Sequence, residues 1–285
     1  MSNKFLAVLA QFGVIDATQA QNMQQVLAMT GSTDVARQYA EQRLQEAYSQ
    51  GLLAQSERLF KFLAQNQTPS AAQWDAFWAQ ENTALWASVK PAVTETAQQS
   101  AIMASVGLGD SWRVVNERVL EWVNAYYVSS AEYGSVENLN QTGRRQVAEA
   151  FAAWQRGELQ HDLGLPSLAL ELQETFGKNR AKIIAITETT RIYSEAERQT
   201  AIADPDVVYL RWMTGADELV CPVCAPLHGR IVGKEENGIA HPAGLYTGWP
   251  PAHSRCRCRL ASETAKSVQI PLRDSFNPNL PKVQP

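Results

Sequence analysis

Long apolar runs are missing from this chain of 285 residues, and no stretch approaches the roughly 18 apolar residues that a membrane-spanning helix needs. We therefore expect no membrane partner. The opening segment, MSNKFLAVLAQFGVID, has a short apolar run but no small-residue cleavage site after it. It predicts an amphipathic helix rather than a secretory signal. Without an export signal, the four cysteines are expected in a reducing compartment, where thiols and metal ligands are favoured over disulfides.

An excess of positive charge is also missing. The net charge is −4 for the whole chain, and residues 140–285 carry 17 Lys+Arg against 16 Asp+Glu. Residues 1–139 carry 8 Lys+Arg against 13 Asp+Glu, a net of −5. This balance disfavours sequence-independent binding of nucleic acid by the whole surface. At 45% hydrophobic and 19% charged residues, the composition is that of a folded protein.

Proline is scarce in the first part, where only Pro69 and Pro91 precede residue 140. Because proline interrupts helices, long helices are expected there. Apolar residues at three- and four-residue spacing predict an amphipathic helix over 35–63. Gly51 is expected to weaken this helix locally. Ser70 and Gln73 predict a capping box that opens another helix. Residues 106–134 mix helical and β-branched character. The Trp and Tyr residues at helical spacing are expected mainly in the core.

The second part changes from helices to strands and loops. Residues 140–143 predict a helix start for 144–157, Pro166 the head of a following helix, and Gly177 its end. A further helix is expected over 178–203, and residues 206–214 are the clearest strand. Residues 215–217 read as a turn.

These features predict an α+β fold in three parts. A helical region, 1–139, is the expected partner-docking part. A small mixed α/β domain covers 140–262. It contains a loop-rich β region, 205–262, that is expected to be held together by a zinc ion. A Pro-rich polar tail covers 263–285.

All four cysteines and three of the four histidines lie between residues 221 and 258. A Cys-x-x-Cys turn (Cys221, Cys224) can place two sulfurs on one tetrahedral Zn²⁺, with Zn–S near 2.3 Å. His253, Cys256 and Cys258 supply the remaining ligands from a separate loop. Thiolate and imidazole together select zinc over calcium or magnesium. Two disulfides or incidental buried thiols are the alternatives.

Five candidate ligands compete for four places, so Cys256 or Cys258 is expected to lie outside a Cys₃His set. This site is predicted to be structural rather than catalytic, because four protein ligands leave no open position for water. His228 and His241 are interpreted as ordinary loop histidines. Arg255, Arg257 and Arg259 alternate with the last cysteines and could contact phosphate or a partner. A solvated face that pairs with local acids is the alternative.

The order of these motifs resembles the head-morphogenesis family of tailed bacteriophages, the Mu F-like minor head proteins. The matching residues are Thr187-Glu-Thr-Thr-Arg191, Cys221-Pro-Val-Cys224-Ala-Pro-Leu-His-Gly229 and Pro250-Pro-Ala-His253-Ser-Arg-Cys256-Arg-Cys258. The resemblance covers about 140–262. His228 stands where the family often has Asn, and Ser254 where it commonly has Pro.

The resemblance implies a non-enzymatic virion component of a phage or prophage. It would act in the capsid interior at the portal vertex, after assembly in the host cytoplasm. Its implied partners are the portal protein, other capsid components and packaged DNA during packaging or ejection. Glu188 and Arg191 are interpreted as a structural helix pair.

Two other functions remain open at this point. One is a zinc-dependent hydrolase or nuclease with Glu188, His228 or His241 as base. The other is a nucleic-acid-binding module that uses the three arginines.

Overall fold

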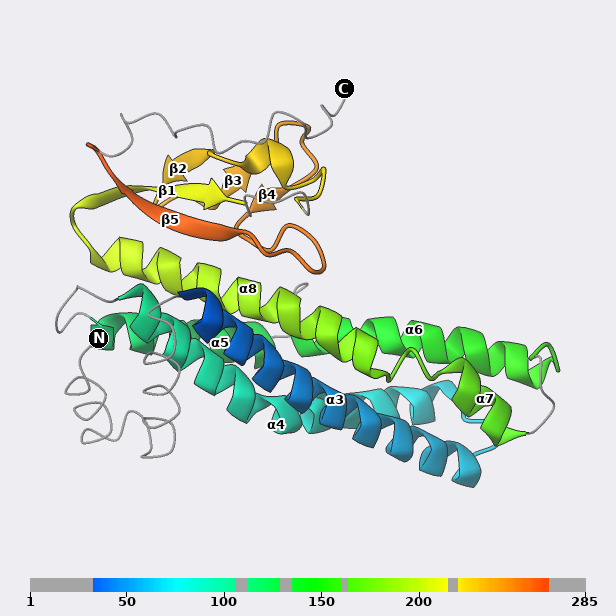
Figure 1. Cartoon of the computed structure of the whole chain (residues 1–285). Helices are drawn as coiled ribbons and strands as arrows, with labels where there is room; N and C mark the ends of the chain where they lie inside the picture. Colours follow the sequence, from blue (N-terminus) through cyan, green and yellow to red (C-terminus); the bar gives the residue numbers. More distant parts are fainter. Residues whose placement is uncertain (1–32, 106–111, 129–134, 160–163, 215–219, 267–285) are drawn as a thin grey trace. The chain divides into compact units, whose positions relative to one another are not determined.

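The computed structural model describes residues 33–105, 112–128, 135–159, 164–214 and 220–266. Within these ranges the helices come first and the short strands follow, which confirms the α+β class with a mostly helical first part (Figure 1). The predicted helix at the start of the chain, the turn at 215–217 and residues 267–285 of the tail lie outside the described residues. None of the described helices is both long and apolar enough to cross a membrane.

The helices are α3 (Thr33–Gln65), α4 (Ala71–Ala104), α5 (Trp112–Val128), α6 (Ser135–Gln155), α7 (Leu165–Glu171) and α8 (Lys178–Ala203). After them come β1 (Val207–Met213), the 3₁₀ turn η2 (Ala225–Leu227), β2 (Ile231–Gly233), β3 (Ile239–Ala240), β4 (Thr247–Gly248) and β5 (Arg259–Thr264).

The helix predicted over 35–63 is present as α3, and it runs through Gly51 without a break. A Cβ at Gly51 would stand 2.8 Å from Leu85 Cδ1, and Leu85 is completely buried. The absence of a side chain at Gly51 thus permits close packing between α3 and α4. Gly51 is a contact point of this helix pair.

The capping box predicted at Ser70 is confirmed at the start of α4. The Ser70 N–H donates to Gln73 Oε1 at 2.8 Å, and the Gln73 N–H donates to Ser70 Oγ at 3.3 Å. Two backbone donors that have no partner within the helix are satisfied in this way.

The sequence of residues 106–134 mixes helical and β-branched character. The described residues of this segment form the helix α5. Val115, Val119 and Val123 recur every four residues, and each is at most 1% exposed. Burial of this one face outweighs the weak helix propensity of valine.

The helix start predicted at residues 140–143 is wrong, because α6 begins at Ser135 and continues to Gln155. Asn140 is 3% exposed, accepts a hydrogen bond from Gln55 Nε2 at 2.8 Å and donates one to Asn82 Oδ1 at 2.7 Å. Its side chain therefore bonds to neighbouring helices instead of capping its own.

The start of α7 and the whole of α8 follow the sequence prediction, whereas the end of α7 does not. Pro166 lies in the first turn of α7, but the helix ends at Glu171 rather than near Gly177. The Gly177 carbonyl accepts from the Ala181 N–H, so Gly177 leads into α8.

The chain divides into two compact units. We call one the sheet unit; it contains the described residues of 1–41, 95–120 and 186–285. The other, the helical unit, contains the described residues of 42–94 and 121–185. The domain boundaries predicted at 139 and 262 remain predictions.

The helical unit has a core of leucines and aromatic rings. Leu44, Leu52 and Leu59 from α3 and Leu85 from α4 are fully buried. Phe62 stacks on Phe77 with ring centroids 4.9 Å apart, which extends the core to the start of α4.

The sheet unit is built on a three-stranded antiparallel sheet with the order β2-β1-β5, so the predicted strand at 206–214 is its central strand. Strands β3 and β4 form a separate two-stranded ribbon. Val207, Leu210 and Leu260 pack with Ala201 of α8, which lies beside the sheet (Figure 1). Arg211 and Glu263 form an ion pair of 2.6 Å between β1 and β5.

Candidate metal centre

A tight turn places Cys221 and Cys224 side by side. The Cys221 carbonyl accepts from the N–H groups of Cys224 and Ala225, at 3.1 and 3.0 Å. The Cys224 N–H also lies 3.4 Å from Cys221 Sγ. Pro226 lies in the 3₁₀ turn that follows, where its lack of an N–H costs nothing. The proline-containing segment thus fixes the geometry that the Cys-x-x-Cys spacing predicts.

The remaining candidate ligands come from the loop that leads into β5. The Cys256 N–H donates to the His253 carbonyl at 3.2 Å, which turns the chain between these two residues. Cys258 directly precedes β5, so the strand anchors the end of the loop.

The two segments bring all five predicted ligands together, and we call these residues, Cys221, Cys224, His253, Cys256 and Cys258, the Cys/His cluster. Their ligand atoms form two groups of three, and in each group all atoms lie within 4.8 Å of one another. One group is Cys221, Cys224 and His253; the other is Cys224, Cys256 and Cys258. Cys224 is common to both. No disulfide joins any of the four cysteines.

The sulfur–sulfur distance in the cluster fits a tetrahedral zinc ion, whereas the nitrogen–sulfur distances are shorter than such an ion requires. Cys224 Sγ lies 3.8 Å from Cys256 Sγ, and two thiolates on one zinc stand about 3.8 Å apart when Zn–S is near 2.3 Å. His253 Nε2 lies 2.9 Å from Cys221 Sγ and 3.1 Å from Cys224 Sγ. A shared zinc would set these nitrogen–sulfur distances at about 3.5 Å, so His253 would have to move outward by about half an ångström.

The thiols of the cluster perturb one another strongly. Hydrogen bonds from the Cys224 and Cys258 thiols lower the pKa of Cys256 to about 2. The same hydrogen bond with Cys256 raises the pKa of Cys224, and burial raises it further. Ionisation of one of these thiols therefore opposes ionisation of its neighbours. A cation at the centre would remove this opposition, because metal-bound thiols are deprotonated.

Three cysteines of the cluster are buried in apolar surroundings, whereas Cys221 and His253 are partly exposed. Cys224, Cys256 and Cys258 are at most 4% exposed and belong to one hydrophobic core with Trp212, Leu227 and Ile239. The ribbon residues Tyr246 and Trp249 pack against the same core. A soft, thiolate-rich donor set beside an apolar core fits a structural zinc ion.

His228 and His241 bond to the backbone, in agreement with their interpretation as loop histidines. His228 Nδ1 accepts from the Thr214 N–H at 3.2 Å. His241 Nδ1 accepts from the Ala243 N–H at 3.1 Å, and its Nε2 lies 3.1 Å from the Val223 carbonyl oxygen. His241 therefore ties the ribbon to the turn between Cys221 and Cys224. Neither role was visible in the sequence, where no spacing links these histidines to their partners.

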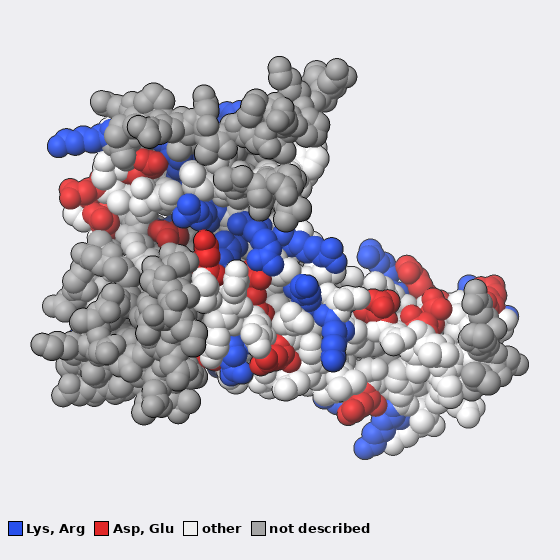
Figure 2. Space-filling model, viewed as in Figure 1, with Lys and Arg blue, Asp and Glu red and all other residues white. Residues whose placement is uncertain are grey.

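The three arginines that alternate with the last cysteines differ in their surroundings. Arg257 Nη1 pairs with Glu41 at 2.7 Å. Burial raises the pKa of Glu197 to about 7, and the nearby Arg259 guanidinium opposes that rise. Arg255, whose φ is 64°, is exposed. Figure 2 shows Lys and Arg side chains with Asp and Glu close beside them on the visible described surface.

Glu188 and Arg191 lie on α8 with Oε1 and Nε 3.5 Å apart. The Glu188 side chain is 7% exposed and that of Arg191 31%. The geometry fits the predicted helix pair at a spacing of three residues.

Residues 145–261 match a family model described as Phage Mu protein F like protein. The match begins in α6, ends in β5 and includes the whole Cys/His cluster. Comparisons with curated proteins and with solved structures gave no match. The family resemblance inferred from the sequence motifs is thereby confirmed.

Proposed function

Because residues 145–261 belong to the Phage Mu F-like head-morphogenesis family, we propose that the chain is a non-enzymatic minor component of a phage head that acts at the portal vertex during procapsid assembly. The family match is the observation that carries this proposal. A structural zinc ion in the Cys/His cluster holds the loop-rich part of the sheet unit together.

The ligand set we assign to this zinc is Cys221, Cys224, His253 and Cys256. Cys224 and Cys256 already stand at the sulfur–sulfur distance that zinc requires. The backbone N–H groups of Cys258 and Ala252 bond to Cys256 and help to lower the pKa of its thiol, just as the Cys224 N–H approaches Cys221 Sγ. Such N–H contacts stabilise bound thiolates. Cys258 packs beside the site.

Several features of the described residues support a structural role over a catalytic one. Four protein ligands close the coordination sphere. His228 Nδ1 and both ring nitrogens of His241 contact backbone groups, and the Glu188 carboxylate lies beside Arg191. A hydrolase needs an open metal position and a free general base. Of the three candidate bases, Glu188 and His241 are engaged in these contacts.

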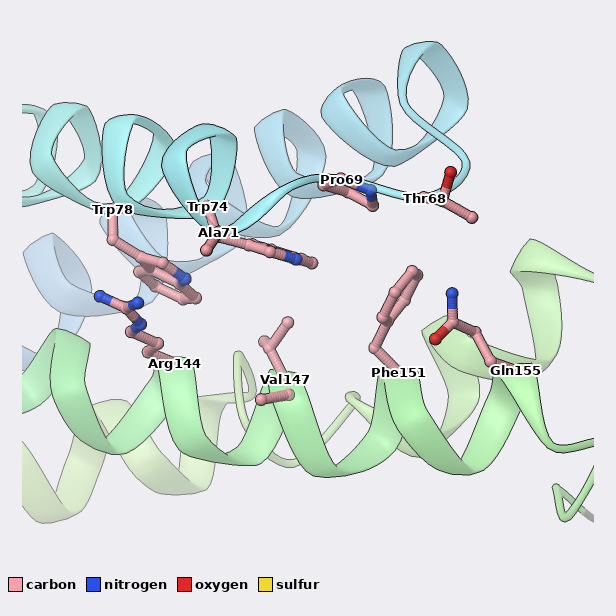
Figure 3. A pocket seen from close by; sticks show the side chains of 10 residues that line it. Thr68, Pro69, Ala71, Trp74, Trp78, Arg144, Val147, Phe151 and Gln155 are labelled. Carbon is pink, nitrogen blue, oxygen red and sulfur yellow. The ribbon is translucent and has the colours of Figure 1, made fainter.

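The contact with the portal or another capsid protein is assigned to the helical unit. A pocket of about 400 Å³ opens between the start of α4 and α6, with Trp74, Trp78, Val147 and Phe151 directed into it (Figure 3). Arg144 stands at the same pocket and pairs with Asp75 at 2.6 Å. A pocket of this size and apolar lining accepts one large apolar side chain of a partner protein, which would serve as an anchor.

Phage particles test the assembly role directly. Mass spectrometry should find the chain in purified heads, and deletion of its gene should stop the production of filled heads. Filled, infectious particles in the deletion strain would overturn the proposal.

Docking is tested by co-purification of the full-length chain with the portal protein, because a cut at residue 139 would remove residues from both compact units. Ala148 is exposed and lines the pocket, so Ala148→Glu should abolish co-purification without unfolding the chain. Gln141→Glu, also exposed on α6, is the matched control. Equal retention of both variants would refute docking at this pocket.

A further inference from the structure

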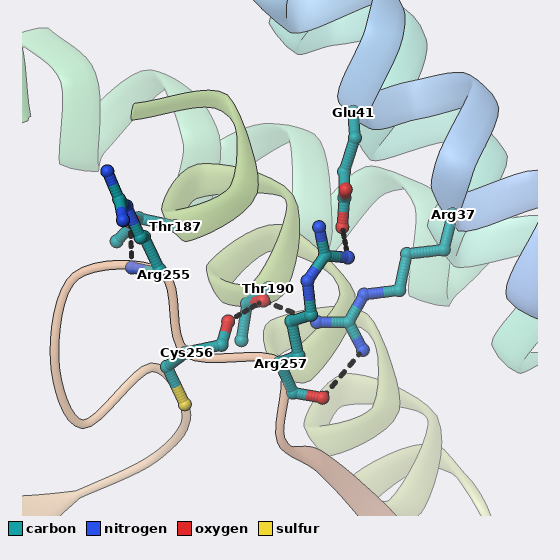
Figure 4. A network of polar contacts seen from close by, with 7 residues as sticks. All are labelled: Arg37, Glu41, Thr187, Thr190, Arg255, Cys256 and Arg257. Atoms are coloured by element: carbon teal, nitrogen blue, oxygen red, sulfur yellow. Dashed lines mark hydrogen bonds and ion pairs between the residues drawn. The ribbon is translucent and has the colours of Figure 1, made fainter. Parts of the chain in front are cut away.

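The loop that carries the candidate ligands is attached to two helices by hydrogen bonds from outside the metal site (Figure 4). The Arg255 N–H donates to Thr187 Oγ1 of α8 at 3.0 Å. One turn further along α8, the Thr190 hydroxyl donates to the Cys256 carbonyl at 2.5 Å. The backbone on both sides of the Cys256 thiol is therefore fixed by α8.

The same threonine connects the loop to the first turns of α3. Arg37 Nη2 donates to Thr190 Oγ1, and Arg37 Nη1 lies 3.5 Å from the Arg257 carbonyl oxygen. Arg257 returns to α3 through its ion pair with Glu41. A continuous chain of polar contacts thus leads from α3 through Thr190 to the backbone of Cys256.

Burial makes this chain sensitive to the position of its acceptors. Thr190 is completely buried and Cys256 is 1% exposed, and burial lowers the pKa of Arg37. A buried hydroxyl that loses its acceptor has no water to replace it.

We propose that the Arg37–Thr190–Cys256 chain couples metal binding at the Cys/His cluster to the attachment of α3 residues 34–41. This inference rests on the metal site proposed above. Bound metal holds the Cys256 backbone where Thr190 can reach it, and loss of metal releases the acceptor, then Arg37, then the start of α3. Coupling between two sites is reciprocal, so weakening the chain of contacts weakens metal binding by the same factor.

The first experiment measures zinc affinity of the full-length chain by competition with a chromophoric chelator. Thr190→Val removes the donor and keeps the side-chain shape, and Arg37→Met removes the guanidinium. Each should weaken zinc binding by about 10–100-fold, the usual effect of losing a contact to a metal ligand from outside the site. Thr190→Ser should restore nearly full affinity. Arg58→Met is the matched control, because Arg58 is also on α3 and pairs with the buried Glu81 at 2.6 Å; its zinc affinity should be that of the parent protein.

The second experiment needs no variant and therefore does not depend on how well Thr190→Val folds. Removal of zinc from the parent protein should increase hydrogen exchange at residues 34–41 of α3 while residues 44–63 of the same helix stay protected. Zinc binding that is equal in all variants, with unchanged exchange at 34–41, would overturn the coupling and leave the metal site intact. A parent protein that binds no zinc would overturn both.

Discussion

Replacement of Cys224 by serine is the most informative perturbation of the metal site. Cys224 is the one cysteine whose sulfur belongs to both groups of candidate ligand atoms. The substitution changes a single atom, and it removes the thiolate that zinc prefers. We expect the variant to lose zinc and the segment 220–258 to lose its fixed structure.

The expected magnitude follows from what else holds this segment. Apart from the cysteines, the buried core around the cluster consists of Trp212, Leu227 and Ile239. Their burial contributes about 5–9 kcal/mol in total, before the entropy of ordering the loops is subtracted. A structural zinc contributes on the order of 10 kcal/mol to such modules. The metal is thus the larger contribution, and the segment should not stay folded without it.

Hydrogen exchange of the full-length chain, read by mass spectrometry, is the assay. Protection should fall across 220–258 in Cys224→Ser and persist at residues 44–63 and 71–94 of the helical unit. Cys258→Ala is the control, since Cys258 is equally buried but lies outside the assigned ligand set; it should keep its zinc and lose only about 1–2 kcal/mol for the small cavity. Unchanged protection of 220–258 in Cys224→Ser would refute the reasoning, and loss of zinc in Cys258→Ala would refute the choice of Cys256.

Three further predictions concern stability. The pKa of Glu197 is raised by burial to about 7, so the folded state binds a proton that the unfolded state releases near pH 4.5, and stability falls as the pH rises from about 4.5 to 7; Glu197→Gln should gain about 1–3 kcal/mol at pH 8 and nothing at pH 4 in urea unfolding, and an equal effect at both pH values would contradict this. Ser70→Ala removes the capping box of α4 and should cost about 1 kcal/mol by the same measurement, whereas no loss would mean that the cap is dispensable. Asn140→Ala leaves the buried Gln55 amide without its acceptor and should cost about 1–3 kcal/mol; a smaller loss than for Ser70→Ala would show that these amides find water.

Local signals in the sequence were sufficient for most of the helices and for identifying the residues that form the Cys/His cluster. The capping box at Ser70, the helix 178–203 and the strand near 206–214 each depend on neighbouring residues, and each is present. The five candidate ligands were found because thiols and imidazoles at these spacings have few other uses. Their spacing could not predict that the candidate ligand atoms form two overlapping groups that share Cys224.

Apart from the end of α7, which the sequence placed near Gly177, the predictions that were wrong or incomplete involve contacts between distant parts of the chain. Asn140 resembles a helix cap in sequence, but its partners are Gln55 and Asn82 on other helices. Thr190 and Arg37 have no spacing relation to Cys256, from which they are 66 and 219 residues away, so their contact with the metal loop becomes visible only in the folded chain. The role of Gly51 likewise depends on Leu85, which belongs to another helix.

The metal content of the full-length chain tests the central claim most directly. Native mass spectrometry of protein purified from a reducing cytoplasm, together with elemental analysis, should find one zinc ion per chain and no disulfide. A protein without bound metal, or one with its four cysteines joined in two disulfides, would contradict the account.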